Sequence, residues 1–184
     1  MRKISNEELG RPTAEEFAAA RKMPVTVVLD NVRSALNVGS FFRTCDAFAA
    51  ERIILCGITA TPPDREIHKT ALGAELTVAW EYAGSAVARV EQLHSEGYTV
   101  LAVEQVEGAV MLHGLEGLNI SAEQNDKKYA LVFGNEVEGV SQQAADLCDG
   151  AIEIPQAGTK HSLNVSVAGG VVLWEFFCRL RLKA

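Results

Sequence analysis

The sequence predicts an α/β protein built on a mostly parallel β-sheet with helices on both faces. Two observations support this prediction. Apolar runs rich in β-branched residues recur along the chain, as in VTVVLD (25–30) and KYALVFGNE (128–136), and strands covered on both faces have this composition. Segments with helical patterns separate these runs, as expected where parallel strands are joined by crossover helices.

Strands are expected at 25–30, 51–57, around 76–80, 98–105, 128–136 and 152–154. Helices are expected at 13–22, after a loop within 31–48, around 68–75 as a short stretch, at 85–96, after 141 as a short helix, and over 163–181 at the end of the chain. Thr13 is expected as an N-cap, with Glu16 completing a capping box, and Pro24 closes that helix. Gly97 is expected to end the helix at 85–96, and Ser141 to cap the short helix that follows it. Short turns are expected in region 106–128.

Length and composition indicate one domain. The chain has 184 residues, of which 48% are hydrophobic and 22% charged, and no apolar run approaches the roughly 20 residues of a membrane span. We expect residues 1–24 to form an N-terminal helical extension and residues 25–184 to form the functional domain. The N-terminus is polar and lacks the apolar core of a secretory signal, so we expect a cytoplasmic protein.

Charge and cysteine content narrow the function classes. The net charge of −7 argues against indiscriminate nucleic-acid binding through a broad basic surface. It does not exclude nucleic acid as a substrate, because a few Lys and Arg residues can gather at one cleft. The four cysteines are scattered without CxxC spacing, which favours reduced, partly buried thiols over a metal site.

Three stretches concentrate residues with chemical potential. The first, NVRSALNVGSFFRT (31–44), follows a buried strand and contains Arg33 and Arg43, whose planar guanidinium groups suit phosphate. A structural alternative is an Asn-rich turn whose arginines pair with Asp30 or Asp46.

The second stretch, LVFGNEVEGVS (131–141), ends a strand at Gly134 and continues with Glu136 and Glu138. Glu136 could bind a ligand hydroxyl or hold an arginine in place, and the alternative is a capping or surface acid.

The third stretch, IEIPQAGTKHSLNVSVAGGVVLWEFF (152–177), is a short strand, a polar loop and a helix-length run. Such a strand-loop-helix junction is a common ligand site in α/β proteins. Its alternative is a solvated loop around Lys160 and His161.

No common nucleotide or hydrolase signature competes with these stretches, since the chain lacks GxGxxG, GxxxxGK[ST], GxSxG and HExxH. Taken in order, the three stretches resemble motifs 1, 2 and 3 of the SpoU (TrmH-like) branch of the SPOUT RNA methyltransferases. The resemblance covers about residues 25–178, and HKTALGAE (68–75) is similar to the family segment between motifs 1 and 2. Three motifs in the expected order are a far more specific signal than any one of them.

The resemblance implies transfer of a methyl group from S-adenosylmethionine to a ribose 2′-hydroxyl of tRNA or rRNA, without a metal. It implies a parallel sheet with a C-terminal trefoil knot, a homodimer, and a cofactor bound at the knot beside the subunit interface. An RNA-binding or assembly factor that keeps the fold without turnover is the alternative, and a small-molecule α/β enzyme is a third interpretation.

The resemblance also implies roles for individual residues. The residues expected to take part in catalysis are Arg43, Glu136, Asn37, Ser162 and Asn164. Those expected to bind the cofactor are Phe133, Gly134, Asn135, Ile154, Pro155, Ser162, Leu163 and Asn164. Those expected to contact RNA are Arg33, Arg43, Lys69 and Lys160. A guanidinium stays protonated in nearly all protein settings, so we expect Arg43 to grip phosphate and stabilise the developing 2′-oxyanion.

Overall fold

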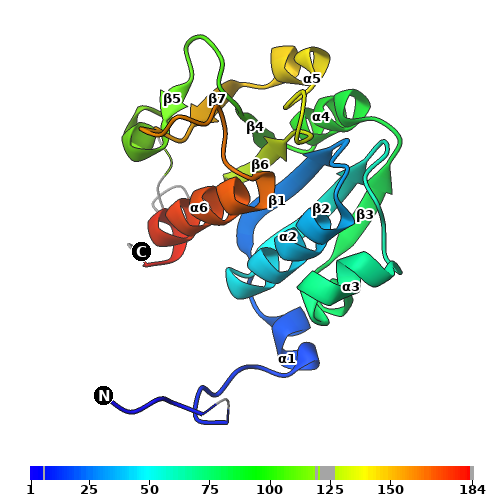
Figure 1. Ribbon diagram of the computed structural model, residues 1–184, viewed down its shortest axis with the longest axis vertical. Helices are drawn as coiled ribbons and strands as arrows, with labels where there is room; N and C mark the ends of the chain where they lie inside the picture. The colour runs from blue at the N-terminus through cyan, green and yellow to red at the C-terminus, as the bar shows by residue number, and fades with distance from the viewer. Residues whose placement is uncertain (6, 119, 121–126, 183–184) are drawn as a thin grey trace.

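The computed structural model describes residues 1–5, 7–118, 120 and 127–182. Its centre is a seven-stranded sheet with the order β3-β2-β1-β6-β4-β7-β5 (Figure 1). The strands are β1 (Met23–Asp30), β2 (Ala50–Cys56), β3 (Trp80–Ala83), β4 (Tyr98–Val103), β5 (Val110–Met111), β6 (Lys128–Phe133) and β7 (Gly150–Glu153). Every pairing between these strands is parallel. The predicted fold class, a parallel α/β sheet, is confirmed.

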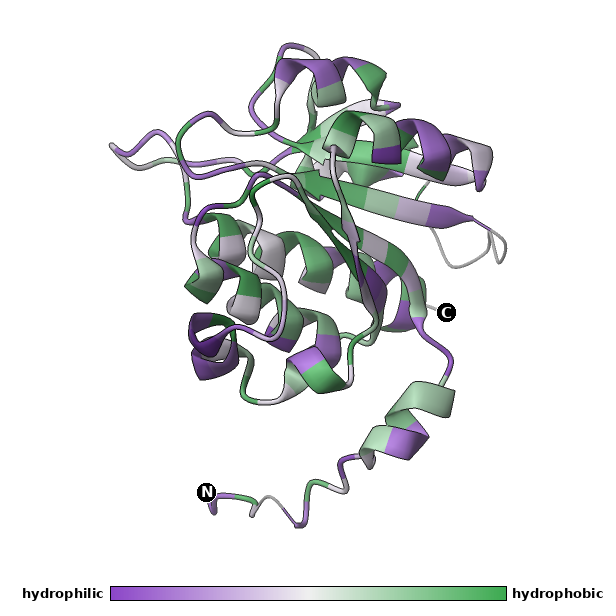
Figure 2. Ribbon diagram, turned by 90° about the vertical axis from the view of Figure 1, so that its right-hand side faces the viewer, coloured by the Kyte–Doolittle hydropathy of each residue, from purple (hydrophilic) through white to green (hydrophobic). Residues whose placement is uncertain are grey.

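Helices cover both faces of the sheet. Figure 1 shows α2 (Ala35–Ala47), α3 (Arg65–Ala71) and α6 (Val165–Phe177) in front of it. The opposite face packs against α4 (Ala86–Ser95) and α5 (Gln142–Leu147), whose apolar residues form a second core cluster. Figure 2 shows hydrophobic residues concentrated in the central strands, whereas hydrophobic and hydrophilic residues alternate along the helices. The sheet is therefore buried on both sides, which explains why its strands appear in the sequence as continuous apolar runs.

Two glycines allow the front helices to pack closely. A Cβ atom on Gly39 of α2 would lie 2.2 Å from the backbone oxygen of Ile67 in α3. A Cβ atom on Gly169 of α6 would lie 2.2 Å from the ring of Phe41 in α2. Larger residues would push these helices apart. Because α2 follows β1 directly, this packing fixes the start of α2 at the edge of the sheet where β1 ends.

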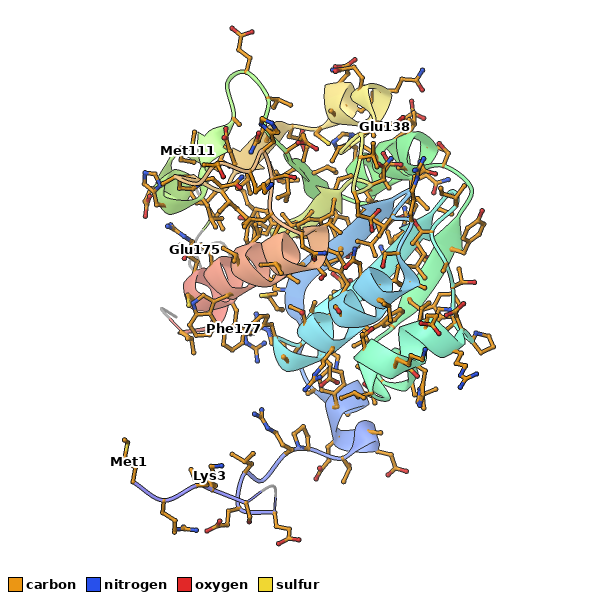
Figure 3. The ribbon with its side chains drawn as sticks, in the orientation of Figure 1. Met1, Lys3, Met111, Glu138, Glu175 and Phe177 are labelled. Atoms are coloured by element: carbon orange, nitrogen blue, oxygen red, sulfur yellow. The ribbon has the colours of Figure 1, made fainter. Side chains whose placement is uncertain are left out.

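The N-terminal segment extends away from the body of the molecule (Figures 1 and 2), and Figure 3 places Met1 and Lys3 at its far end. Its one helix, α1 (Ala14–Ala19), has Thr13 as N-cap and the predicted capping box with Glu16. The helix ends earlier than predicted. Pro24 does not close it, because Pro24 is the second residue of strand β1.

Three other boundaries differ from the predictions. Residues around 76–80 do not form a strand: a 3₁₀ turn occupies Ala74–Leu76 and strand β3 begins at Trp80. The final helix begins at Val165, with Asn164 as its N-cap, and passes into a π-helix at Cys178–Leu182. Ser141 lies at the N-cap of α5, but its side chain makes no capping bond, and its hydroxyl is directed at Asp30, to which it donates.

Region 106–128 holds more than the predicted turns. It contains β5 and a 3₁₀ segment at Leu112–Leu118, while residues 119 and 121–126 lie outside the described part of the chain.

Gly97 follows the last turn of α4 with φ +82, as predicted for a helix-ending glycine. The four cysteines are free thiols, and Cys45 and Cys56 are buried. A search of the described residues finds no helix long and apolar enough to span a membrane.

Candidate active site

The candidate site lies where the central strands end. In a parallel sheet all carboxyl ends meet at one edge, and ligands bind there where the strand order reverses. Here the chain runs from β1 outward to β2 and β3, and β6 and β4 lie on the other side of β1. The reversal therefore falls beside β1, between the segment that follows β1 and the segment that follows β6.

A cavity of about 500 Å³ opens at this edge, within the size range of ligand pockets. It is lined by residues 103–105, 133–139, 152–154, 156, 161–165 and Ala168. These residues come from the ends of β4, β6 and β7 and from the start of α6. The second and third stretches singled out in the sequence thus meet at one pocket.

Glu136 links the pocket to the start of α2. Its carboxylate accepts hydrogen bonds from the backbone N–H of Arg33 at 3.0 Å, from the backbone N–H of Ser34 at 3.2 Å and from the Asn37 side-chain amide at 2.7 Å. Partial burial raises the pKa of Glu136, but these hydrogen bonds, the one from Asn37 foremost, outweigh it and leave the pKa below its ordinary value. The ionised carboxylate is therefore the stable form, and it ties motif 2 to motif 1.

Asn37 joins a second set of partners. Its side-chain oxygen accepts from the Asn164 amide at 3.1 Å and from the Ser166 hydroxyl at 3.3 Å. Asn164 in turn caps α6, because its side-chain oxygen accepts from the backbone N–H groups of Ser166 at 3.0 Å and Val167 at 3.3 Å. A continuous network thus runs from Glu136 through Asn37 to the N-terminus of α6. It brings all three sequence motifs together through side chains.

A tight hairpin carries Glu136. Asn135 and Gly139 exchange backbone hydrogen bonds of 3.1 and 3.0 Å, and the Asn135 side chain accepts from the N–H groups of Val137 and Glu138, both at 2.8 Å. A Cβ atom on Gly134 would lie 1.8 Å from the backbone carbon of Gly139. Only glycine fits at position 134, so the hairpin folds back onto the end of β6.

Two carboxylates hold the exit of this hairpin, and neither was predicted from the sequence. Asp30, at the end of β1, is 2% exposed and accepts from the Ser141 N–H at 3.0 Å, the Ser141 hydroxyl at 2.6 Å and the Asn31 amide at 2.7 Å. Glu104, after β4, accepts from the Val140 N–H at 2.9 Å. Acidic residues at strand ends are common, and their hydrogen-bond partners on the hairpin lie far away in the sequence. Local patterns therefore gave no signal for them.

The predicted cofactor contacts gather at the pocket. The predicted residues that line it are Phe133, Gly134, Asn135, Ile154, Ser162, Leu163 and Asn164, while Pro155 does not. Of the residues predicted for catalysis, Glu136, Ser162 and Asn164 line the pocket, and Asn37 is bonded to two of them.

Arg43 lies apart from the pocket within this chain. It is an exposed residue near the end of α2, about 9 Å beyond Asn37 at the rise of an α-helix, and it is not among the lining residues.

The predicted RNA contacts Arg33, Lys69 and Lys160 are exposed as well. Lys69 pairs with Glu66 at 2.5 Å. The alternative pairing of an arginine with Asp30 or Asp46 is not present, since Asp30 binds Asn31 and Ser141 and the Asp46 carboxylate accepts from the Thr77 hydroxyl.

Comparison with known proteins places this arrangement in a family. The model of the SpoU rRNA methylase family matches residues 24–174, a range that contains the sheet, the hairpin and most of α6. The chain belongs to the SpoU rRNA methylase family. The predicted resemblance is confirmed, and the matched range begins where the extended N-terminal segment ends.

Individual proteins resemble the chain over most of its length. A tRNA (guanosine(18)-2′-O)-methyltransferase of Thermus thermophilus is 34% identical over 177 residues, which is 96% of this chain and 86% of that protein. A 23S rRNA (guanosine-2′-O-)-methyltransferase, RlmB, of Vibrio vulnificus is 26% identical over 92% of this chain and 65% of its own.

Solved structures of RNA-modifying enzymes share the fold. The A. aeolicus TrmH/SpoU tRNA modifying enzyme superposes with a TM-score of 0.77 at 25% identity, over 92% of this chain and 83% of that one. An AdoMet-bound rRNA methyltransferase from Sinorhizobium meliloti superposes with a TM-score of 0.73 at 28% identity. This chain covers 59% of that longer chain, and 87% of this chain is aligned.

Proposed function

We propose that this SpoU family protein transfers a methyl group from S-adenosylmethionine to a ribose 2′-hydroxyl of tRNA or rRNA. The observation that carries the proposal is the network that joins Glu136, Asn37 and Asn164 at the mouth of the pocket. The family match and the names of the relatives, which include both tRNA and rRNA 2′-O-methyltransferases, give the reaction class.

The pocket fits S-adenosylmethionine. Its volume suits a ligand of that size, and residues 133–139 of the hairpin form part of its wall. Backbone of Phe133–Asn135, Ile154 and Ser162–Asn164 would hold the adenosyl part, with Pro155 next to Ile154 in the loop. The bound cofactor supplies an electrophilic methyl group on a sulfonium.

The chain's own residues position the acceptor. With the cofactor bound, the ribose oxygen would take the methyl carbon, the carbon–sulfur electron pair would stay on sulfur, and the hydroxyl proton would pass to solvent. Asn37 and Glu136 are held rigidly by each other, so they can orient the ribose without reorganisation. The Arg43 guanidinium stabilises the developing oxyanion and the neighbouring phosphate.

Arg43 requires a second protomer in this proposal. One chain leaves it outside the pocket, yet it lies on α2, the helix that packs against α6. The solvent side of α6 is apolar: Val167 is 53% exposed, Val171 39% and Trp174 50%. An apolar helix face of this kind marks a protein–protein interface. We infer a homodimer in which α6 faces the partner and Arg43 of one protomer enters the site of the other.

Four further parts of the proposal follow the family resemblance. The C-terminal segment forms a trefoil knot, which is supported by the position of β7 between the earlier strands β4 and β5. Residues 1–24 form an extension to a methyltransferase domain at 25–184. The protein acts in the cytoplasm, where tRNA and rRNA are modified. Arg33, Lys69 and Lys160 supply part of the contact with RNA phosphates.

The variant Arg43→Ala tests the assignment, because it separates cofactor binding from turnover. We expect it to bind S-adenosylmethionine as the unaltered protein does, measured by calorimetry, and to lose methyl transfer by at least about 100-fold. Arg11→Ala, which removes an equal charge outside the matched range, is the control and should keep its turnover. Unchanged turnover in Arg43→Ala would remove this residue from the mechanism.

A further inference from the structure

The ionisable residues that line the pocket are almost all acidic. They are four glutamates, Glu104, Glu136, Glu138 and Glu153, together with His161. Within the described part of the chain, the lining contains no lysine and no arginine. A site that accepts RNA would be expected to be basic. The acidic lining therefore suits a different ligand of the same site.

Two of these glutamates are partly buried and lie on neighbouring strands. Glu104 follows β4 and Glu153 ends β7, which pairs with β4. The Glu104 carboxylate accepts one backbone hydrogen bond at each oxygen, from Val140 and from Gln105, both at 2.9 Å. Each oxygen has a second lone pair that these bonds leave available.

Among the described residues, the Glu153 side chain has no partner. No described residue donates a hydrogen bond to its carboxylate or forms an ion pair with it. No described lysine, arginine or histidine forms an ion pair with Glu104 either. Even partial removal of a carboxylate from water carries a cost when no opposite charge compensates it. Two such carboxylates at one pocket are best explained by a ligand that brings positive charge.

The proposed cofactor has this property, and its product does not. At neutral pH S-adenosylmethionine carries a sulfonium, an ammonium and a carboxylate, so its net charge is positive. When the methyl group leaves, the electron pair stays on sulfur, and S-adenosylhomocysteine has no net charge. We propose that Glu104 and Glu153 select the sulfonium cofactor over its thioether product by charge, so that methyl transfer itself weakens binding and promotes product release. This inference rests on the proposed function.

Coulomb's law sets the size of the effect. A unit charge within a pocket of this size, at the intermediate dielectric of a half-open cavity, changes an affinity by roughly 3- to 5-fold per carboxylate. Dissolved salt should reduce the effect, because it screens charges that are open to solvent.

Calorimetric titration with three ligands tests the inference. The ligands are S-adenosylmethionine, S-adenosylhomocysteine and sinefungin, in which a protonated amine on carbon replaces the sulfonium. The variants are Glu104→Gln and Glu153→Gln. Glu107→Gln is the matched control, because Glu107 is exposed in the same loop as Glu104 but does not line the pocket.

Each lining variant should lower the ratio of S-adenosylmethionine to S-adenosylhomocysteine affinity by roughly 3- to 5-fold, and sinefungin should follow S-adenosylmethionine. Glu107→Gln should leave the ratio unchanged. Glu153→Gln carries the test if Glu104→Gln misfolds, since the Glu153 side chain makes no hydrogen bond in the described structure. A ratio that stays constant in both variants, or sinefungin that follows S-adenosylhomocysteine, overturns the inference alone. Failure of the unaltered protein to bind any of the three overturns the proposed function.

Discussion

Asp30 offers the sharpest test of how the site is held together. This carboxylate lies at the end of the central strand β1, is 2% exposed, and accepts three hydrogen bonds, two from Ser141 and one from Asn31. Ser141 follows directly on the hairpin that carries Glu136. Asp30 therefore anchors the hairpin to the sheet, and we treat it as a positioning residue with no contact to substrate.

The substitution Asp30→Asn keeps the shape and removes one acceptor. One oxygen becomes an amide that faces the N–H donors of Ser141 or Asn31, so at least one buried bond to a charged group is lost. Such a bond contributes about 1.5–3 kcal/mol, and an unsatisfied buried donor costs about 1–3 kcal/mol more. The Ser141 hydroxyl can rotate to accept from the new amide, which offsets part of the loss. We expect the free energy of unfolding to fall by about 2–4 kcal/mol.

Urea denaturation at one fixed protein concentration measures this change. Asp46→Asn is the control, because the Asp46 carboxylate accepts a single bond, from the Thr77 hydroxyl at 3.0 Å, and should cost under about 1 kcal/mol. Methyl transfer by Asp30→Asn should also fall by roughly 10- to 100-fold under conditions where the protein stays folded, since small displacements of positioned groups are costly. A loss of less than about 0.5 kcal/mol would show that Asp30 does not anchor the hairpin.

Three further predictions concern the dimer and Glu136. Trp174→Glu places a charge on the apolar face of α6 and should convert the dimer to monomers in sedimentation experiments; a dimer that persists would place the interface elsewhere. Arg43→Ala and Glu136→Gln should each be inactive, yet their equimolar mixture should recover about a quarter of full activity, since half the dimers then hold one intact composite site; no recovery would mean that both residues act within one chain. The pKa of Glu136 is lowered in the folded protein, so the stability it contributes is present above its unfolded value near 4.5 and is lost as the pH falls through its folded pKa. The acid limb of a stability-against-pH curve should be shallower in Glu136→Gln, and two superimposable limbs would contradict the hydrogen-bonding account.

The sheet could be predicted because burial on both faces leaves a composition that is recognisable strand by strand. The runs at 25–30, 51–57, 98–105 and 128–136 became β1, β2, β4 and β6 with small changes at their ends. The prediction for the run LTVAW was wrong because apolar composition does not fix register. Pairing of Ile53 with Trp80 sets the start of β3, and the residues before it turn in a 3₁₀ segment.

Polar residues at the site were harder to predict, because their partners are distant in sequence. Ser141 has the local pattern of an N-cap, but the buried carboxylate of Asp30 competes for its hydroxyl. Asn164 was predicted for the site from the motif, and its capping of α6 became clear only with the helix start in view. Motif 1 places Asn37 and Arg43 close together in sequence, yet the rise of a helix separates them. Spacing along a motif thus indicated which residues matter but not which of them meet.

Our proposal requires that this chain methylates a ribose oxygen. The most direct measurement is incubation of the purified protein with S-adenosylmethionine carrying a CD₃ group and with unmodified transcripts of tRNA and of 23S rRNA, followed by digestion to nucleosides and mass spectrometry. We expect the label to appear on the ribose of one nucleoside in at least one of these RNAs and to be lost with Arg43→Ala. Label on a base, or no label in either RNA from a protein that binds the cofactor, would contradict it.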